Sequence, residues 1–454
     1  MTVLPVPASI VPHEGLFRFD AATSATGPCA ELLGLPLHAD GSVRLRLGGP
    51  AELGDEGYEL RVRTEGVVIA ARTVAGLRHG VATLRQLRGT GSTVSAVTIV
   101  DRPRYSYRGV MLDVARHFFP VADVLRLVDL AALLKLNHLH LHLTDDQGWR
   151  VAIDSWPRLA EFGGGTEVGD GPGGHYTKAD YTTIVEHAAA SGITVVPEVD
   201  VPGHTNAALA SYGVLAPGGV APERYRGIEV GFSALAVGTP AVDRFLDDVF
   251  GELAALTPGP WLHFGGDEVK TLSPVDYAGI VTRAQEVILR HGKTPIGWHE
   301  VAQVPLLPAT VVQYWGVNHA PMTLATGNRV IMSPADRTYL DMKYDASTPV
   351  GYDWAGHLPT PAAHDWDPET YLSSVDPSAV LGIEAPLWTE TVRNWSDAQR
   401  LLMPRLAVLA EVGWSTPSQR ASWSDVAARL AAQAPLWTAL GIDFHRDPSV
   451  PWSA

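Results

Sequence analysis

Two adjacent acidic residues, Asp267 and Glu268, follow a pair of glycines in the stretch HFGGDEV at residues 263–269. Carboxyl groups can hydrolyse a glycosidic bond when two of them flank it, roughly 5 to 10 Å apart. Neighbouring side chains on an extended backbone point in diverging directions, so this pair cannot approach one carbon atom from opposite faces. If only one of them is a general acid, the nucleophile is another carboxylate, such as Glu390 or Asp341, or comes from the substrate itself.

Other polar and aromatic residues occupy similar places, each soon after a short apolar run. They are Arg116, His117, Asp145, Asp146, Asp200, His204, Trp298, Trp315, Tyr339, Asp341, Trp388 and Glu390. Taken singly, each has a structural explanation, such as a surface ion pair, a helix cap or a core tryptophan. Core tryptophans should scatter over strands and helices, whereas these gather at the ends of the runs. Carboxylates combined with flat aromatic walls suit a sugar, whose C–H faces stack on rings while its hydroxyls take polar partners.

Eight apolar runs must position these side chains, and helical stretches separate many of them. The runs cover residues 109–113, 138–143, 193–199, 261–266, 294–298, 310–315, 329–333 and 380–385. This alternation is typical of parallel strands joined by crossover helices. Eight repeats predict an α/β fold of the (β/α)8 TIM-barrel type, in which active sites lie at the C-terminal strand ends. We expect helices at 121–135, 178–191, 240–256, 274–291 and 397–412.

The N-terminal part has a different pattern. The stretches SVRLRLGG and YELRVRTEGVVIA are strand-like, and AGLRHGVATLRQLR has apolar residues at helical spacing. We therefore expect a small α+β domain at 1–104 and the barrel domain at 105–454, with a junction in DRPRYSYRG at 101–109. Two long segments rich in Gly, Pro and aromatic residues, near 200–236 and 334–379, are expected to shape a substrate cleft or to form surface excursions.

Composition excludes several classes of protein. The chain has 34 basic and 49 acidic residues, a formal charge of −15, which disfavours nucleic acid and anionic membranes as partners. Its single cysteine, Cys29, excludes an intramolecular disulfide and a cysteine-based metal cluster. The first fifteen residues lack a basic segment followed by a continuous apolar one. This predicts a cytoplasmic location; the oligomeric state cannot be read from the sequence.

Seven stretches resemble the family 20 glycoside hydrolases, the β-N-acetylhexosaminidases. They are DVARHFF (113–119), HLHLTDDQGWR (140–150), PEVDVPGHT (197–205), HFGGDEV (263–269), GWHE (297–300), YLD (339–341) and PLWTE (386–390). The resemblance spans most of 105–415, in order and at barrel-compatible positions. The small N-terminal domain also resembles the one that precedes this family's barrel.

The resemblance implies a retaining exo-β-N-acetylhexosaminidase that needs no cofactor and no metal. It would release terminal β-linked N-acetylglucosamine or N-acetylgalactosamine from glycosides and oligosaccharides. Catalysis would be substrate-assisted, with the 2-acetamido oxygen as nucleophile and an oxazolinium-type intermediate. Glu268 would be the general acid and base, and Asp267 would hydrogen-bond the acetamido N–H. Asp145 and His204 would orient Glu268 and tune its proton affinity.

The resemblance also implies contacts with the terminal sugar. Arg116 would bind the C3 and C4 hydroxyls, and Glu390 the C4 and C6 side, next to Trp388. Tyr339 would hydrogen-bond the acetamido carbonyl oxygen, and Asp341 the region of the C6 hydroxyl. These contacts are compatible with either configuration at C4.

Three tryptophans have further implied positions. Trp298 and Trp315 would wall the pocket of the acetamido methyl group, and Trp354, in the stretch DWAG, would line the outer cleft. The strand residues His140 and His142 are two apart and share one face of their strand; we interpret them as barrel-interior histidines.

Three alternatives remain open from the sequence. A metal-dependent barrel hydrolase would use the HLH pair as ligands, but it needs further histidines where Trp298 and Trp315 stand. A non-catalytic carbohydrate-binding barrel should lack the acid, and Glu268 is present. A disaccharide-releasing family relative (lacto-N-biosidase-like) would need only a deeper cleft.

Overall fold

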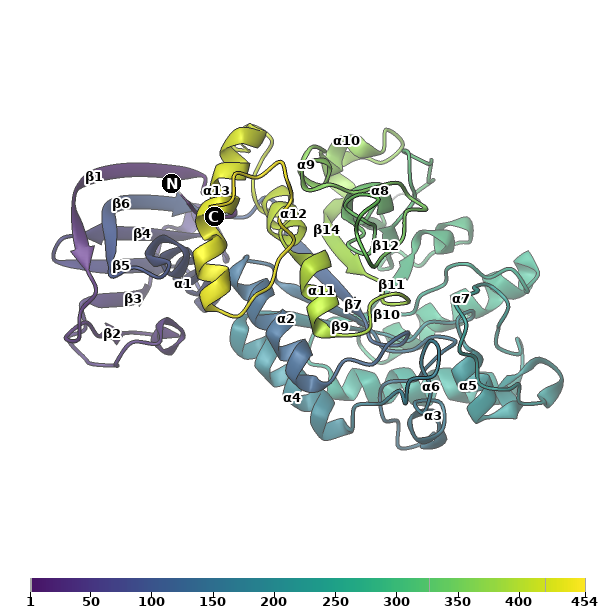
Figure 1. Cartoon of the computed structure of the whole chain (residues 1–454). Coiled ribbons are helices and arrows are strands. Elements are labelled where there is room, and N and C mark those ends of the chain that lie inside the picture. Colours follow the sequence, from purple (N-terminus) through teal and green to yellow (C-terminus); the bar gives the residue numbers. More distant parts are fainter. Residues whose placement is uncertain (1, 326, 421, 454) are drawn as a thin grey trace.

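The larger part of the chain is a closed barrel of eight parallel strands (Figure 1). The computed structural model describes residues 2–325, 327–420 and 422–453. Around the barrel the strands are β10 (Trp261–His263), β11 (Thr294–Trp298), β12 (Val311–Tyr314), β13 (Arg329–Met332), β14 (Val380–Leu387), β7 (Tyr107–Asp113), β8 (His138–His142) and β9 (Thr194–Glu198). Each predicted run overlaps one of these strands, so the predicted (β/α)8 barrel is confirmed.

The barrel helices follow the predicted pattern in four of five cases. α2 (Val121–Leu133), α4 (Lys178–Ser191), α6 (Pro240–Leu256) and α7 (Pro274–Arg290) lie where the sequence predicts helices. The fifth prediction, one helix at 397–412, is wrong, because α11 (Trp395–Leu402) and α12 (Arg405–Trp414) are separate helices. Pro404 stands between them and has no N–H to continue the helical hydrogen bonds.

Shorter helices and one long C-terminal helix complete this part. The short ones are α3 (Arg158–Glu161), α5 (Asn206–Ser211), α8 (Ala335–Thr338), α9 (Thr360–His364) and α10 (Pro368–Tyr371). The long one, α13 (Trp423–Ala439), lies between the barrel and the N-terminal sheet in Figure 1. Gln433 of α13 donates a hydrogen bond of 2.6 Å to the carbonyl of Thr2, so α13 contacts the beginning of the described chain.

A six-stranded sheet with one helix precedes the barrel. Its strand order is β1-β6-β4-β5-β3-β2, with β1 (Ser9–Arg18), β2 (Ala25–Thr26), β3 (Val43–Leu47), β4 (Tyr58–Arg63), β5 (Gly66–Ala71) and β6 (Thr93–Asp101). Helix α1 (Val74–Arg88) covers one face, where Leu77, Val81 and Leu84 share a buried core with residues of the sheet. The predicted small α+β domain is therefore present.

Buried charges join the sheet to the N-terminal ends of the barrel strands. Lys135, shortly before β8, donates to Asp101 at 2.8 Å and to Tyr58 at 2.9 Å. Arg108 of β7 donates to Glu56 at 2.7 Å. Since β6 ends at Asp101 and β7 begins six residues later, we propose that the boundary at 104/105 lies within this short link.

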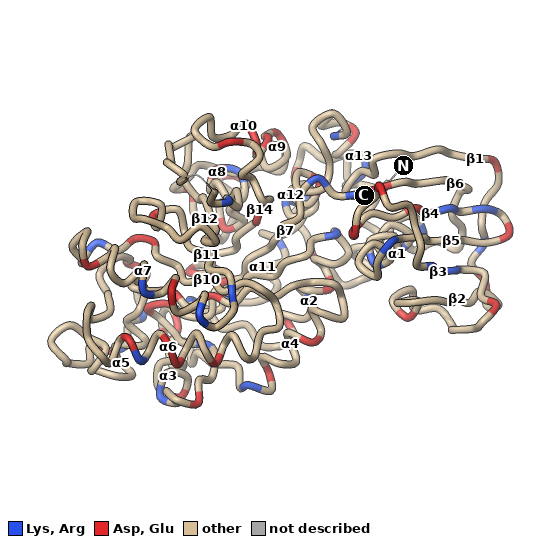
Figure 2. Tube along the Cα trace, turned by 180° about the vertical axis from the view of Figure 1, so that it is seen from behind, with Lys and Arg blue, Asp and Glu red and all other residues tan. Residues whose placement is uncertain are grey.

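Charged residues of both signs occur in both parts of the chain. In Figure 2, Lys and Arg are interspersed with Asp and Glu over both the sheet and the barrel, in a chain whose net charge is −15. Among the described residues, none of the helices combines the length and apolarity that crossing a bilayer requires.

Candidate active site

A cavity of about 300 Å3 opens at the C-terminal ends of the barrel strands. This volume is at the lower end of the range of about 300–1,000 Å3 for ligand pockets, which suits a small ligand such as one sugar unit. Most of the predicted site residues line it, namely Arg116, Asp267, Glu268, Trp315, Tyr339, Asp341, Trp354, Trp388 and Glu390. Asp145, His204 and Trp298 are not among its lining residues.

A glycine turn after β10 presents the two adjacent acids. Gly265 and Gly266 have φ values of +68° and +98°, a region that favours glycine. A Cβ on Gly265 would lie 1.8 Å from Oδ1 of Asp200, and the N–H of Gly266 donates to the same oxygen at 3.1 Å. The turn therefore leaves Asp267 buried, with an exposed fraction of 7%, and places Glu268 more openly on the cavity wall.

The imidazole of His204 stands behind both acids. Nε2 of His204 lies 3.6 Å from Oε2 of Glu268 and 3.7 Å from Oδ2 of Asp267. On its other side, Nδ1 donates to Oδ1 of Asp145 at 3.1 Å. Asp145 also pairs with Arg116 at 2.8 Å. Asp145 and His204 thus lie behind Glu268 and outside the lining of the cavity.

The two acids have opposite protonation tendencies in the protein alone. Burial, together with the charge of Glu268, raises the pKa of Asp267 to about 6, although His204 opposes this rise. Burial also acts on Glu268, but the neighbouring positive charges of His204, Arg116 and Lys270 overcome it and lower the pKa of that carboxyl. Below about pH 6 the proton therefore resides on Asp267 rather than on Glu268.

Several buried polar atoms of residues on the cavity wall have no hydrogen-bond partner within the described part of the chain. They are Nε of Arg116, Oδ1 of Asp267, Oδ1 of Asp341 and Oε2 of Glu390. Burial and the charge of Glu390 raise the pKa of Asp341 well above its usual range. Buried polar groups are normally paired because leaving them unpaired is costly. A ligand with several hydroxyl groups would provide the missing partners.

Aromatic side chains form the rest of the wall. The ring of Tyr339 lies 6.0 Å from Trp354 and 6.3 Å from Trp388, and Trp315 lies 6.1 Å from Trp354. Trp354 is 51% exposed, which places it at the mouth. Trp298 is fully buried behind this wall, 5.7 Å from Trp388, and its indole N–H donates to Glu198.

Sequence reasoning missed four residues of the site. Ile228 and Val230 reach the cavity from the segment near 200–236, and Tyr352 from the segment near 334–379. The only feature of the sequence that points to these three residues is the length of the two segments. Both segments do help to form the cleft. Glu300, in the stretch GWHE, accepts from the indole of Trp315 at 3.0 Å, and burial beside Asp267 raises its pKa to about 8.

The remaining polar residues of the motifs are engaged inside the protein. Asp146 accepts hydrogen bonds from Ser233 and from the N–H of Asn206. The histidines of the HLH pair, which the metal-dependent alternative requires, face carboxylates with both ring nitrogens. His140 lies between Glu384 and Glu198, and His142 between Glu198 and Asp145.

A larger cavity lies elsewhere and contains none of the predicted site residues. It measures about 510 Å3 and is lined by residues of α1, α2 and α11 and of the segment after α13. Convergent carboxylates and aromatic rings, rather than size, therefore identify the smaller cavity as the candidate active site.

Comparison with known proteins gives a consistent result. The family model described as "Glycosyl hydrolase family 20, catalytic domain" matches residues 105–274 and 273–417, and "Glycosyl hydrolase family 20, domain 2" matches residues 20–102. A Beta-N-acetylhexosaminidase from Cellulomonas fimi is 50% identical over 418 residues, which cover 90% of this chain and 84% of the relative.

Solved structures agree with these matches. The Streptomyces plicatus N-acetyl-beta-hexosaminidase in complex with Thio-NAglucal superposes with a TM-score of 0.95 at 47% identity, covering 100% of this chain and 98% of that one. A Vibrio harveyi exo beta-N-acetylglucosaminidase in complex with N-acetylglucosamine gives a TM-score of 0.87 at 30% identity, with 98% and 78% covered. The resemblance seen in the sequence is confirmed, and the chain belongs to glycosyl hydrolase family 20.

Proposed function

We propose that this family 20 glycoside hydrolase is a retaining exo-β-N-acetylhexosaminidase that uses the acetamido group of its substrate as the nucleophile. One observation carries the proposal. Two adjacent carboxyl groups, Asp267 and Glu268, share one imidazole and lie on the wall of a cavity suited to one sugar unit. The relatives' names, which refer to N-acetylhexosaminides, support the same substrate class.

The first step breaks the glycosidic bond. The acetamido oxygen attacks the anomeric carbon, the bond to the leaving oxygen breaks, and Glu268 donates its proton to that oxygen. Asp267 accepts a hydrogen bond from the acetamido N–H and stabilises the positive charge that develops on the ring formed. The adjacent acids thus serve neighbouring atoms of one sugar.

The second step restores the enzyme. Glu268, now a carboxylate, takes a proton from water, and the oxygen of this water attacks the anomeric carbon from the face that the leaving group vacated. The bond to the acetamido oxygen breaks, so the anomeric configuration is retained overall.

Substrate binding must reverse the proton distribution of the protein alone. The reaction needs a proton on Glu268 and a charge on Asp267, whereas burial and His204 favour the opposite. An acetamido N–H donated to Asp267 favours its ionised form, and a sugar that covers Glu268 removes water and favours its neutral form. Part of the free energy of substrate binding is therefore used to move the proton to Glu268.

The remaining lining residues would hold the sugar. Arg116, Asp341 and Glu390 offer unpaired buried atoms to its hydroxyls. Tyr339 would bind the acetamido carbonyl oxygen, and Trp388 and Trp315 would pack against the sugar and its acetamido methyl group. Trp298 would support this wall from behind, since it is buried against Trp388.

A cytoplasmic location and small imported oligosaccharides as natural substrates remain part of the proposal. The charge of −15 supports uncharged or weakly charged glycans rather than polyanions as substrates. Activity found mainly in the culture supernatant of the source organism would contradict the cytoplasmic location.

Hydrolysis of an aryl 2-acetamido-2-deoxy-β-glucoside, with and without a thiazoline analogue of the intermediate, tests the function. We expect turnover and tight competitive inhibition, and no turnover of the aryl β-glucoside that lacks the acetamido group. Equal turnover of both glycosides would refute participation of the acetamido group. Turnover only of an aryl disaccharide would favour the disaccharide-releasing alternative.

A further inference from the structure

The interior of the barrel carries a buried polar layer beneath the active site. Barrels of this type are usually filled by Val, Ile and Leu. One cluster of buried residues on the barrel strands is mainly apolar in this way and contains Val196, Ile296, Val311 and Ile331. The polar layer contains fully buried side chains from five strands, namely His140, Glu198, Trp298, Gln313 and Glu384. Buried ions usually stabilise a fold less than apolar side chains of similar size. Their presence under the site suggests a role in its chemistry.

Glu198 is the centre of this layer. Its Oε2 accepts from Nε2 of His140 at 3.0 Å and from Nδ1 of His142 at 2.5 Å. Its Oε1 accepts from the indole N–H of Trp298 at 2.8 Å, and Nδ1 of His263 lies 3.0 Å from the same atom. Hydrogen bonds therefore hold Glu198 from β8 and β11 at once.

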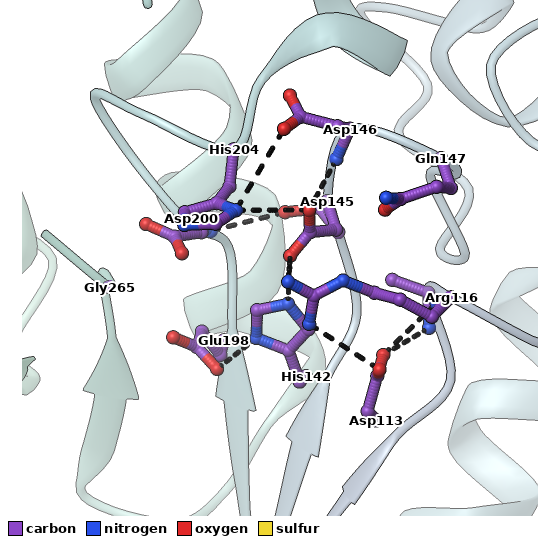
Figure 3. A network of polar contacts seen from close by, with 12 residues as sticks. Asp113, Arg116, His142, Asp145, Asp146, Gln147, Glu198, Asp200, His204 and Gly265 are labelled. Carbon is purple, nitrogen blue, oxygen red and sulfur yellow. Dashed lines mark hydrogen bonds and ion pairs between the residues drawn. The ribbon is translucent and has the colours of Figure 1, made fainter. Parts of the chain in front are cut away.

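The contacts of Glu198 continue through His142 to Asp145 and His204 (Figure 3). His142 donates from Nε2 to Oδ2 of Asp145 at 2.8 Å. Asp145 in turn accepts from His204, whose Nε2 lies 3.6 Å from Glu268. Acids and imidazoles thus alternate from Glu198 to Glu268.

This alternation determines the charge of the two central imidazoles. A carboxylate can only accept, so a ring with a carboxylate at each nitrogen must carry two protons. Burial opposes this charge on His142, but Glu198 and Asp145 raise its pKa well above the usual value. Burial likewise opposes it on His140, while Glu384 and Glu198 raise the pKa to about 9.

We propose that Glu198 is a positioning residue for Glu268. It holds His142 as a cation with Nε2–H directed at Asp145, and this fixes Asp145 and His204 behind the general acid. Without the Glu198 charge, His142 can lose a proton and stop donating to Asp145. Asp145 then attracts His204 and Arg116 more strongly, and His204 no longer holds Glu268 in place. This inference rests on the proposed function of Glu268.

The test compares leaving groups in the variant Glu198→Gln, which preserves the size of the side chain. For aryl 2-acetamido-2-deoxy-β-glucosides with a poor leaving group, kcat/KM should fall about 10- to 100-fold, the range typical of residues that orient a reactive group. For a dinitrophenyl glycoside, whose leaving group departs without a proton, the fall should be much smaller. Equal losses on both substrates would overturn the proposal.

Glu411→Gln is the matched control. Glu411 is also a buried carboxylate, paired with Arg429 at 2.6 and 2.8 Å, but it lies on α12 outside the active site. This variant should lose stability while changing kcat/KM for the two substrates by the same factor. If the wild-type protein hydrolyses neither glycoside, the proposed function is refuted. If the wild-type protein is active but Glu198→Gln loses equal activity on both substrates, only the positioning role of Glu198 is refuted.

Histidine-selective 15N NMR of the wild-type protein tests the same proposal if the variant does not fold. The groups that face the two rings are Glu384, Glu198 and Asp145, with Arg116 and His263 nearby. We expect two imidazoles that keep both protons from pH 6 to pH 8, above the ordinary histidine pKa of about 6.5. Loss of a proton from either ring within that range would overturn the proposal.

Discussion

Replacing Asp267 by Asn should remove most of the catalytic rate without removing the fold. The side chain keeps its size but loses the charge that would stabilise the positive intermediate. Two unit charges about 4 Å apart interact by about 4 kcal/mol at an effective dielectric constant of about 20, and Asp267 is nearly buried. Since about 1.36 kcal/mol corresponds to a tenfold change in rate, the upper limit is about 1,000-fold. Charge development is partial, so we expect kcat to fall several hundredfold.

The pH dependence of kcat/KM distinguishes this role from simple damage to the site. The reaction needs a single proton on the two acids, because Glu268 must be protonated while Asp267 is ionised. In the protein alone that proton resides on Asp267, so wild-type kcat/KM should fall as the pH rises through about 6, where the proton is lost. The Asn variant should lack this fall. Asp341→Asn, the same change on the same cavity wall, is the control and should raise KM while keeping the fall above about pH 6. A near-wild-type rate, or an unchanged fall above about pH 6, for Asp267→Asn would refute the reasoning.

Three further substitutions probe the acid, the glycine turn and the cavity mouth. Glu268→Gln should lose about 100- to 10,000-fold in kcat on poor leaving groups and far less on a dinitrophenyl glycoside; equal losses would count against Glu268 as the acid. Gly265→Ala should lower both Tm and activity, because the new Cβ would clash with Asp200 and φ is +68°; an unaltered melting temperature would contradict this explanation. Trp354→Ala should leave Tm unchanged, because the side chain is 51% exposed, and raise KM for chitin oligosaccharides about three- to tenfold, the worth of one stacking contact. A KM equal to that of the wild type would remove Trp354 from the substrate path.

The barrel and most of the cavity wall are predictable from the sequence because both depend on local patterns. Buried parallel strands appear as apolar runs, and a residue that follows such a run must lie at the C-terminal end of the barrel. This rule alone predicts that Asp267, Trp315 and Glu390 lie at that end, and all three line the cavity. The break between α11 and α12 also has a local signal, Pro404, but the apolar pattern that continues on both sides of it predicts a single helix.

Other parts of the site depend on packing that no local pattern reveals. Trp298 ends its strand like Trp315, yet it turns into the barrel interior and donates to Glu198, which follows from strand register and side-chain packing. Ile228 and Val230 reach the cavity through a long segment without periodicity. The bond between Glu198 and His142 joins two strands that lie 56 positions apart in the sequence. The pairing of β8 with β9, in which His142 and Glu198 are register partners, brings these two residues together.

The central claim is that the substrate supplies the nucleophile. It is tested most directly by the rates for aryl 2-amino-2-deoxy-β-glucosides that carry an acetyl, fluoroacetyl, difluoroacetyl or trifluoroacetyl group on nitrogen. Fluorine withdraws electrons from the carbonyl oxygen and weakens it as a nucleophile, so we predict a steep fall in kcat/KM with each added fluorine. A rate independent of fluorine content would contradict the mechanism and would return the role of nucleophile to a carboxylate such as Asp341 or Glu390.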